Sequence, residues 1–410
     1  MIPKDRMFHK FAAYGFLKNL RLFEPFILLF FLGAGLDFTE IGVLIAIKQV
    51  SVYILEIPTG VYADAMGRRR SMLMSMLSYM VSFSIFFLFS SFWLFALAMV
   101  LYALGDAYRT GTHKAMILEY LKIKGISDRK VEYYGATRSF SQLGSALNAL
   151  LAGLIVFYTG NYRDIFIITI IPYILNFINL ATYPRILDGE IMRELGRGRV
   201  MRQFRGTISD FKNMLKDKVA LRAILNSSLF SGSYEAVKDY LQAVLKVFAL
   251  SLPIFMYLGQ DKRTAVVIGV VYFFIYLMNS YASRNAYRIV KRVGNLARAI
   301  NVTLILGAVT ILLAGAFYHW NLLVLSILLF LLIYVLQNLR RPMNVGYIAE
   351  RIKSRVMASG LSVESQTKTI IAASLSVFMG FFADLFGVGS ALALVGFLVL
   401  LLAPLVFVGD

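Results

Sequence analysis

Charged and polar residues recur at helical spacing inside long apolar stretches of the sequence. Two sets follow the pattern i, i+4, i+7, i+11, which places each set on one face of an α-helix. They are Tyr14, Lys18, Arg21 and Pro25, and Tyr102, Asp106, Arg109 and His113. Arginine can bind a carboxylate or phosphate through two parallel hydrogen bonds, and a carboxylate can accept and release a proton. Anion binding and proton transfer are therefore the chemistry that these residues could perform.

Other apolar stretches carry similar groups. Glu24 follows Arg21 at i+3 and can pair with it on a helix. Further polar residues within later apolar stretches are Tyr234, Glu235, Lys238, Asp239, Gln337 and Arg341. The three histidines are scattered and the chain has no cysteine, so the sequence predicts no metal site and no cofactor.

The composition predicts an all-α integral membrane protein. Of the 410 residues, 59% are hydrophobic and 16% are charged. A soluble domain is about 45–50% apolar and about 25% charged. Because a water-soluble core of this size cannot hold the excess apolar side chains, most of them must face lipid. The candidate residues above therefore lie within predicted membrane spans, except Arg341, which lies just beyond the end of one.

Twelve apolar segments are long enough to cross a bilayer, which requires roughly 20 residues each. The predicted spans are 10–33, 39–63, 71–90, 93–120, 133–158, 164–184, 221–246, 264–283, 299–318, 320–339, 359–383 and 387–408. Alternate connectors hold 29 of the 42 lysines and arginines, and the opposite connectors hold three. This asymmetry predicts that both termini lie in the cytoplasm of a multi-pass cell-membrane protein. It also explains the net charge of +19 without a nucleic-acid partner.

The longest connector, 185–220, separates six spans from six. We expect an N-terminal six-helix bundle over 1–184, a cytoplasmic linker over 185–220 and a C-terminal six-helix bundle over 221–410. In the linker, Phe211, Met214, Leu215 and Val219 recur at helical spacing among charged residues. That pattern is typical of an amphipathic helix at the membrane surface.

The connector after the second span carries a recognisable motif, GVYADAMGRRR, at 60–70. It closely resembles the signature loop between helices two and three of the major facilitator superfamily. The motif positions are filled by Gly60, Ala63, Asp64, Gly67, Arg68 and Arg69, and the preceding Glu56-Ile57-Pro58-Thr59 resembles a run common in prokaryotic members. The chain departs from the family at Ala65, where a basic residue is usual.

The resemblance implies two six-helix bundles that alternate between inward-facing and outward-facing states. It implies that Gly60, Asp64, Gly67, Arg68 and Arg69 form a conformational latch. It also places spans one, four, seven and ten around a central cavity. The resulting candidates for substrate binding are Tyr14, Lys18, Arg21, Tyr102, Arg109, His113, Lys238, Gln337 and Arg341. The candidates for proton coupling are Glu24, Asp106, Glu235 and Asp239.

The sequence therefore predicts a secondary active transporter of a small solute. No G-x-x-x-x-G-K-[ST] motif for nucleotide binding occurs, so an ion gradient or the solute's own gradient would drive transport. We favour a proton-coupled organic-anion carrier that acts as a monomer. The alternatives are an efflux carrier for drug-like lipophilic compounds, a polytopic membrane enzyme and a solute sensor; of these, an enzyme is not expected.

The charged residues within the spans have a second interpretation, in which they pair with one another and only fix helix packing. A charge at mid-bilayer costs about 2.5–3.5 kcal/mol on insertion scales. Glu24 and Asp106 can each neutralise one arginine, which leaves Lys18 without an obvious partner in spans one and four. That surplus favours an anionic solute, although Glu56 or Glu235 could also approach it in the folded chain.

Overall fold

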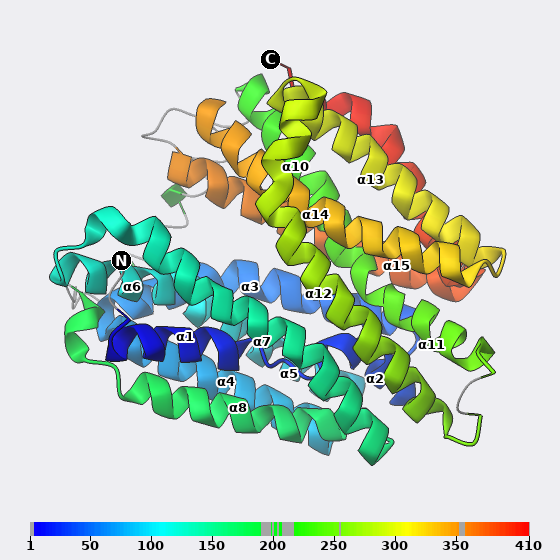
Figure 1. Cartoon of the computed structure of the whole chain (residues 1–410), viewed down its shortest axis with the longest axis horizontal. Coiled ribbons are helices and arrows are strands. Elements are labelled where there is room, and N and C mark those ends of the chain that lie inside the picture. The colour runs from blue at the N-terminus through cyan, green and yellow to red at the C-terminus, as the bar shows by residue number, and fades with distance from the viewer. Residues whose placement is uncertain are drawn as a thin grey trace. The chain divides into compact units, whose positions relative to one another are not determined.

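The computed structural model describes residues 4–189, 198, 201–202, 205–206, 217–253, 256–351 and 357–409. Within these residues the regular elements are helices (Figure 1). The predicted amphipathic segment with Phe211, Met214 and Leu215 lies outside the described residues.

Contacts group the chain into two compact units. The first contains Met1–Phe26 and Ser51–Gln203, and the second contains Ile27–Val50 and Phe204–Asp410. Residues 27–50, which hold the end of predicted span one, the connector and the start of predicted span two, are thus grouped with the second half of the sequence.

The first unit is built from helices that match predicted spans one and three to six. They are α1 (Arg6–Lys18), α4 (Arg68–Leu88), α5 (Phe92–Arg109), α6 (Thr112–Ile123), α7 (Lys130–Thr159) and α8 (Asp164–Ala181), with the 3₁₀ turns η1 (Glu24–Phe26), η2 (Ser127–Arg129) and η3 (Arg185–Asp188). The long helix α3 (Phe38–Met66) begins in the second unit and ends in the first.

The second unit holds the remaining helices. They are α2 (Ile27–Gly33), α10 (Lys218–Val237), α11 (Leu241–Ser251), α12 (Gln260–Val293), α13 (Leu296–His319), α14 (Leu323–Arg351) and α15 (Met357–Leu402), with the turns η4 (Lys238–Tyr240) and η5 (Ala403–Val406). Asp384 of α15 caps the start of α3 by accepting hydrogen bonds from the amides of Phe38 and Thr39, at 3.0 and 2.7 Å.

The predicted set of twelve spans is confirmed, with three spans interrupted. Nine helical segments of the described chain are long and apolar enough to cross a membrane. One of them, Val363–Val406, contains predicted spans eleven and twelve and bends at Gly387, where φ is +81°. Spans one and seven are each divided, into α1 and α2 and into α10 and α11. Span four is divided between α5 and α6.

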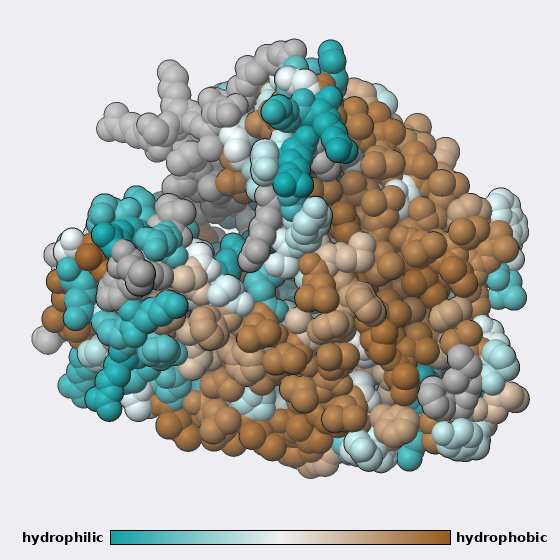
Figure 2. Space-filling view, in the orientation of Figure 1, coloured by the Kyte–Doolittle hydropathy of each residue, from teal (hydrophilic) through white to brown (hydrophobic). Residues whose placement is uncertain are grey.

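The surfaces of the helices fit a lipid environment. On α8, residues such as Phe166 and Tyr173 are buried, while the opposite face exposes Ile167, Ile171 and Ile178. A helix that is apolar all round belongs in a bilayer or a large core. Figure 2 shows hydrophobic side chains over most of the visible face and hydrophilic ones gathered near helix ends.

Candidate functional site

The first span is interrupted where its charged residues lie. α1 ends at Lys18, and a turn that carries Arg21 leads to η1 and α2. Carbonyl groups freed by such a break need donors from the protein, because lipid supplies none. Asn148 Nδ2 donates to the Arg21 carbonyl at 3.1 Å, and the Tyr173 hydroxyl donates to the Lys18 carbonyl at 3.2 Å. Helices α7 and α8 thus supply the donors that stabilise the break.

The fourth span is interrupted two residues after Arg109. α5 ends at Arg109, Gly111 has a φ of +75°, and α6 begins at Thr112. Glycine reaches this left-handed conformation without a steric penalty. The Ser71 hydroxyl donates to the Tyr108 carbonyl at 2.9 Å. Both interruptions therefore lie beside predicted site residues, in broken helices of the kind that form binding sites in many transporters.

Asp106 is the centre of a cluster of charged and phenolic groups in the first unit. It accepts hydrogen bonds from Arg109 Nη2 at 2.9 Å and from the Tyr79 hydroxyl at 2.5 Å. Arg21 Nη2 lies 3.7 Å from the same carboxylate oxygen. Arg109 Nε also donates to the Tyr79 hydroxyl oxygen at 3.3 Å. One carboxylate therefore holds two guanidinium groups, one from span one and one from span four.

Tyr79 belongs to this cluster although the sequence did not single it out. It lies on α4, and its ring packs against Gly105 of α5. A Cβ atom built on Gly105 would lie 2.9 Å from ring atoms of Tyr79, closer than such atoms approach in proteins. Gly105 thus allows the phenol to reach Asp106. The sequence could have suggested a close helix contact at this glycine, but not which ring fills it.

Aromatic rings surround the charged groups. The rings of Tyr14 and His113 stack with their centroids 3.7 Å apart, and His113 Nε2 lies 3.4 Å from the Tyr183 hydroxyl. The Arg21 guanidinium lies 5.9 Å from the centroid of the Tyr102 ring. The structure therefore brings together the site residues predicted in spans one and four.

The cluster contains more positive than negative charge. Lys18 and Arg21 interact electrostatically with Asp106 and Glu24, and Arg109 is within the same group. Three cations and two carboxylates give a formal charge of +3 − 2 = +1. Within the described residues, Lys18 forms no ion pair shorter than 4.0 Å, whereas both arginines share Asp106.

The candidates in the second unit form a different arrangement. Lys238 Nζ pairs with Glu235 Oε2 at 2.7 Å and lies 5.9 Å from the centroid of the Tyr234 ring. The span breaks here at η4, and the Tyr334 hydroxyl donates to the Lys238 carbonyl at 3.1 Å. Lys238 therefore has an acidic partner three residues earlier in the same span. The neighbouring Asp239 lies within η4 and is partly exposed.

Span ten places its arginines differently from the predicted pattern. Gln337 donates to the Ser231 hydroxyl at 3.3 Å, but Arg341 is exposed. The adjacent Arg340 is 1% exposed and donates to Thr303 Oγ1 at 2.8 Å and Asn226 Oδ1 at 2.7 Å. Adjacent residues point about 100° apart on a helix. The buried arginine, which the sequence analysis missed, ties α14 to α10 and α13.

The motif loop is reduced to one residue between two helices. α3 ends at Met66, Gly67 has a φ of +95°, and α4 begins at Arg68. The Arg69 amide donates to Asp188 Oδ1 at 2.7 Å, and Arg68 Nη1 lies 3.6 Å from Glu119 Oε2. Asp188, which the sequence analysis did not select, thus occupies the helix N-terminus where an anion is stabilised.

Two further motif residues, Gly60 and Asp64, are exposed. Gly60 has no atom within 4 Å of an ideal Cβ position, so the structure shows no close helix contact there. Asp64 lies in the last turn of α3 and is exposed. Their predicted part in a latch is therefore a hypothesis about another conformational state.

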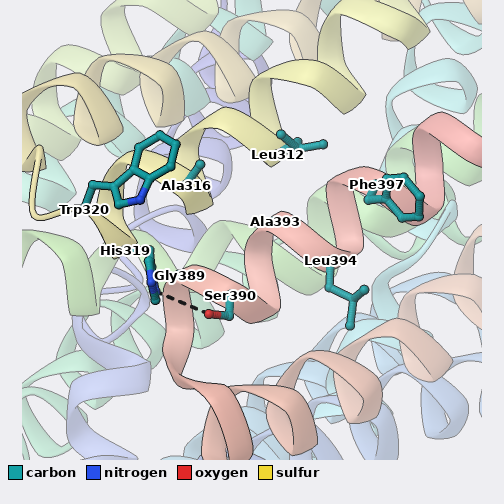
Figure 3. A pocket seen from close by; sticks show the side chains of 9 residues that line it. All are labelled: Leu312, Ala316, His319, Trp320, Gly389, Ser390, Ala393, Leu394 and Phe397. Carbon is teal, nitrogen blue, oxygen red and sulfur yellow. Dashed lines mark hydrogen bonds between the residues drawn. The ribbon is translucent and has the colours of Figure 1, made fainter.

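An apolar groove of about 460 Å³ lies between α13 and α15, far along the sequence from the charged cluster (Figure 3). Leu312, Trp320 and Phe397 contribute to its walls, and His319 Nδ1 lies 3.4 Å from the Ser390 hydroxyl oxygen. Its lining side chains include no Asp, Glu, Lys or Arg. The groove therefore offers no charged group to a polar solute.

Comparison with known families identifies the class of protein. A sequence model of the Major Facilitator Superfamily matches residues 19–365. The chain belongs to the major facilitator superfamily. This membership makes it a multi-pass membrane transporter and not an enzyme, and it confirms the fold that the 60–70 motif predicted.

One curated relative of this superfamily member matches at low identity. The uncharacterised MFS-type transporter YxaM of Bacillus subtilis (strain 168) is 23% identical over 182 residues, which is 44% of this chain and 43% of that protein. The matched part thus spans less than half the length of this curated relative.

Solved transporters share its fold over nearly the whole chain. The nucleoside transporter NupG has a TM-score of 0.76 at 12% identity, covering 98% of both chains. A POT family transporter in complex with 5-aminolevulinic acid has a TM-score of 0.73 at 14% identity, covering 98% of this chain and 95% of that one. The D-xylose-proton symporter has a TM-score of 0.68 at 15% identity, covering 98% and 97%. At these identities the likeness shows the fold alone.

Proposed function

We propose that this transporter is a proton-coupled carrier of a small organic anion. The observation that carries the proposal is the cluster in spans one and four, where three cations share two carboxylates. A surplus cation inside a membrane is costly without an anion nearby. A carboxylate or phosphate on the solute would supply that anion at Lys18, and Arg109 offers the bidentate geometry that suits either group.

The proton would be carried by Asp106. In the structure this carboxylate binds Arg109 and lies near Arg21, so it competes with any anionic solute for the same guanidinium groups. Protonation of Asp106 removes the competing charge and frees the arginines for the solute. Proton binding and anion binding would then strengthen each other, as linkage requires. A pH gradient could drive accumulation by this route.

A ligand panel on the purified transporter tests the charge preference. The panel contains the anions succinate, citrate and glycerol 3-phosphate. We expect the compounds that raise the melting temperature of the protein most to be among these three, because each presents an anion to the Lys18 and Arg109 cluster. Uridine, a dipeptide and D-xylose represent the solutes named for transporters of similar fold. Tetraphenylphosphonium represents lipophilic cations. Stabilisation by tetraphenylphosphonium with no response to any anion would contradict our proposal. It would instead support an efflux carrier for lipophilic compounds.

We also propose that the 60–70 loop acts as a conformational latch on the cytoplasmic face of a cell membrane, as the basic connectors predict. The loop's residues Gly60, Asp64, Gly67, Arg68 and Arg69 match the family motif. In this structure Arg68 and Arg69 contact Glu119 and Asp188, while Asp64 is exposed. Contacts that exist in one state only would bias the equilibrium between the two states of the carrier.

Two substitutions in the loop separate a structural role from a switching role. Gly67→Val is expected to lower the free energy of unfolding by at least about 1–2 kcal/mol. The reason is that φ at this position is +95° and a Cβ atom would lie 2.9 Å from the Asp188 carboxyl carbon. Asp64→Asn is expected to leave the melting temperature unchanged and to slow uptake into proteoliposomes. Wild-type uptake by Asp64→Asn would reduce Asp64 to an ordinary helix end.

A further inference from the structure

A second groove, of about 520 Å³, lies between α12 and α14 within the second unit. One part of its lining is apolar and comes from both helices: Leu277 from α12, and Val335 and Leu339 from α14. Leu277 is 47% exposed although it lies in a membrane-spanning segment. This part of the groove therefore faces the hydrocarbon region of the bilayer and suits an acyl chain.

The other part of the groove is polar and lies toward the carboxyl end of α12. Asn285, Arg288 and Arg292 line it at positions i, i+3 and i+7, which is one face of the helix. Fifteen residues separate Leu277 from Arg292, a rise of about 22 Å along the helix axis. Figure 2 shows hydrophilic side chains at this end of α12 and hydrophobic ones along its middle. The lining thus changes from apolar to cationic along a single groove.

The two arginines are available to an anion. Both are exposed, and neither takes part in an ion pair with any described carboxylate. The polar neighbours of the Arg288 side chain are tyrosines: Nε donates to the Tyr287 hydroxyl oxygen at 3.3 Å, and Tyr281, which also lines the groove, interacts with the guanidinium group. Cationic pockets between membrane helices, at the level of the headgroups, attract anionic lipids.

We propose that this groove binds an anionic phospholipid, with Arg288 and Arg292 on its phosphate and an acyl chain along Leu277, Val335 and Leu339. The polarity and the length of the groove match a molecule that is charged at one end and apolar along the rest. The apolar groove between α13 and α15 has no charged lining residue and offers no such preference for headgroup charge. The proposal requires a membrane protein but not the proposed solute or its coupling.

The test uses the full-length protein, stripped of lipid in a neutral detergent and titrated with dioleoyl phosphatidylglycerol. Binding is measured by thermal shift and by native mass spectrometry, with dioleoyl phosphatidylcholine as the uncharged reference. Arg288→Gln with Arg292→Gln removes both cations. Each of the single variants Arg288→Gln and Arg292→Gln is compared with Lys291→Gln, the matched control, because this also removes one positive charge from the same exposed helix end but does not line the groove.

We expect phosphatidylglycerol to stabilise the wild-type protein more than phosphatidylcholine does. A basic residue near a membrane surface contributes about 1 kcal/mol to the binding of an anionic lipid. Because the double variant lacks two such residues, its apparent affinity for phosphatidylglycerol should fall about 30-fold. The Lys291→Gln protein should bind it as the wild type does. Equal loss in Lys291→Gln would overturn the proposal in favour of general surface charge. Full stabilisation by inorganic phosphate alone would also overturn it, because no acyl chain would then be needed.

Discussion

An Arg109→Ala transporter is expected to bind the preferred anion of the ligand panel about a hundredfold more weakly than the wild type. Removing one partner of a buried, hydrogen-bonded charge pair costs about 2–5 kcal/mol, and every 1.4 kcal/mol is tenfold in affinity. Arg109 is positioned for this role because Asp106 and Tyr79 fix its guanidinium group. The dissociation constant, measured by calorimetry on detergent-purified protein, checks the expectation.

Companion variants distinguish recognition from simple charge. Arg109→Lys keeps the charge but cannot make the bidentate contact, so its affinity should fall between those of the wild type and Arg109→Ala. Lys18→Ala should also weaken binding, because Lys18 supplies the surplus charge of the cluster. Arg129→Ala, in the exposed turn η2, is the control and should bind normally. Unchanged affinity in folded Lys18→Ala and Arg109→Ala proteins would reduce both residues to structural roles.

An Asp106→Asn transporter is expected to lose all stimulation of uptake by an inward proton gradient. The amide cannot take up a proton, and it no longer competes with the solute for Arg109 and Arg21. Exchange of labelled for unlabelled solute across proteoliposomes should persist, because exchange needs no net proton movement. Both rates are measured in the same vesicles, with and without the gradient.

Two outcomes separate the parts of this proposal. Gradient-driven uptake by Asp106→Asn at the wild-type rate would contradict the role of Asp106 as proton carrier. Glu24→Gln is the comparison variant in span one, and loss of stimulation there alone would move the role to Glu24. Loss of both uptake and exchange in a folded Asp106→Asn protein would instead indicate that Asp106 positions the two arginines.

Hydropathy and charge predicted the spans because these properties depend on residue type and not on contacts. The boundary between spans eleven and twelve was predicted close to Gly387, where the long helix α15 bends. The helical stripe in span four likewise placed Asp106 and Arg109 together. The local i, i+3 spacing was sufficient for that pair.

Contacts between distant segments could not be predicted in this way. Span seven breaks at η4 without a glycine or proline at the break. The Tyr334 hydroxyl, which donates to the Lys238 carbonyl at this break, lies on another helix. Asp188 reaches the start of α4 from more than 100 residues away. In span ten, Gln337 and Arg341 share a face by spacing, yet packing buries Arg340 beside them. Such outcomes depend on which helix faces meet.

The connection between α3 and α4 through Gly67 alone has a consequence for how the chain enters the membrane. A single residue joins a 29-residue helix to a 21-residue helix that runs back, and both are apolar enough to span. Three arginines directly follow that glycine and resist transfer through the hydrocarbon. Because only one residue connects them, we expect that the two helices do not integrate into the membrane independently. We expect them to partition into the bilayer together, as one helical hairpin, and the three arginines predict that its tip stays on the side of synthesis.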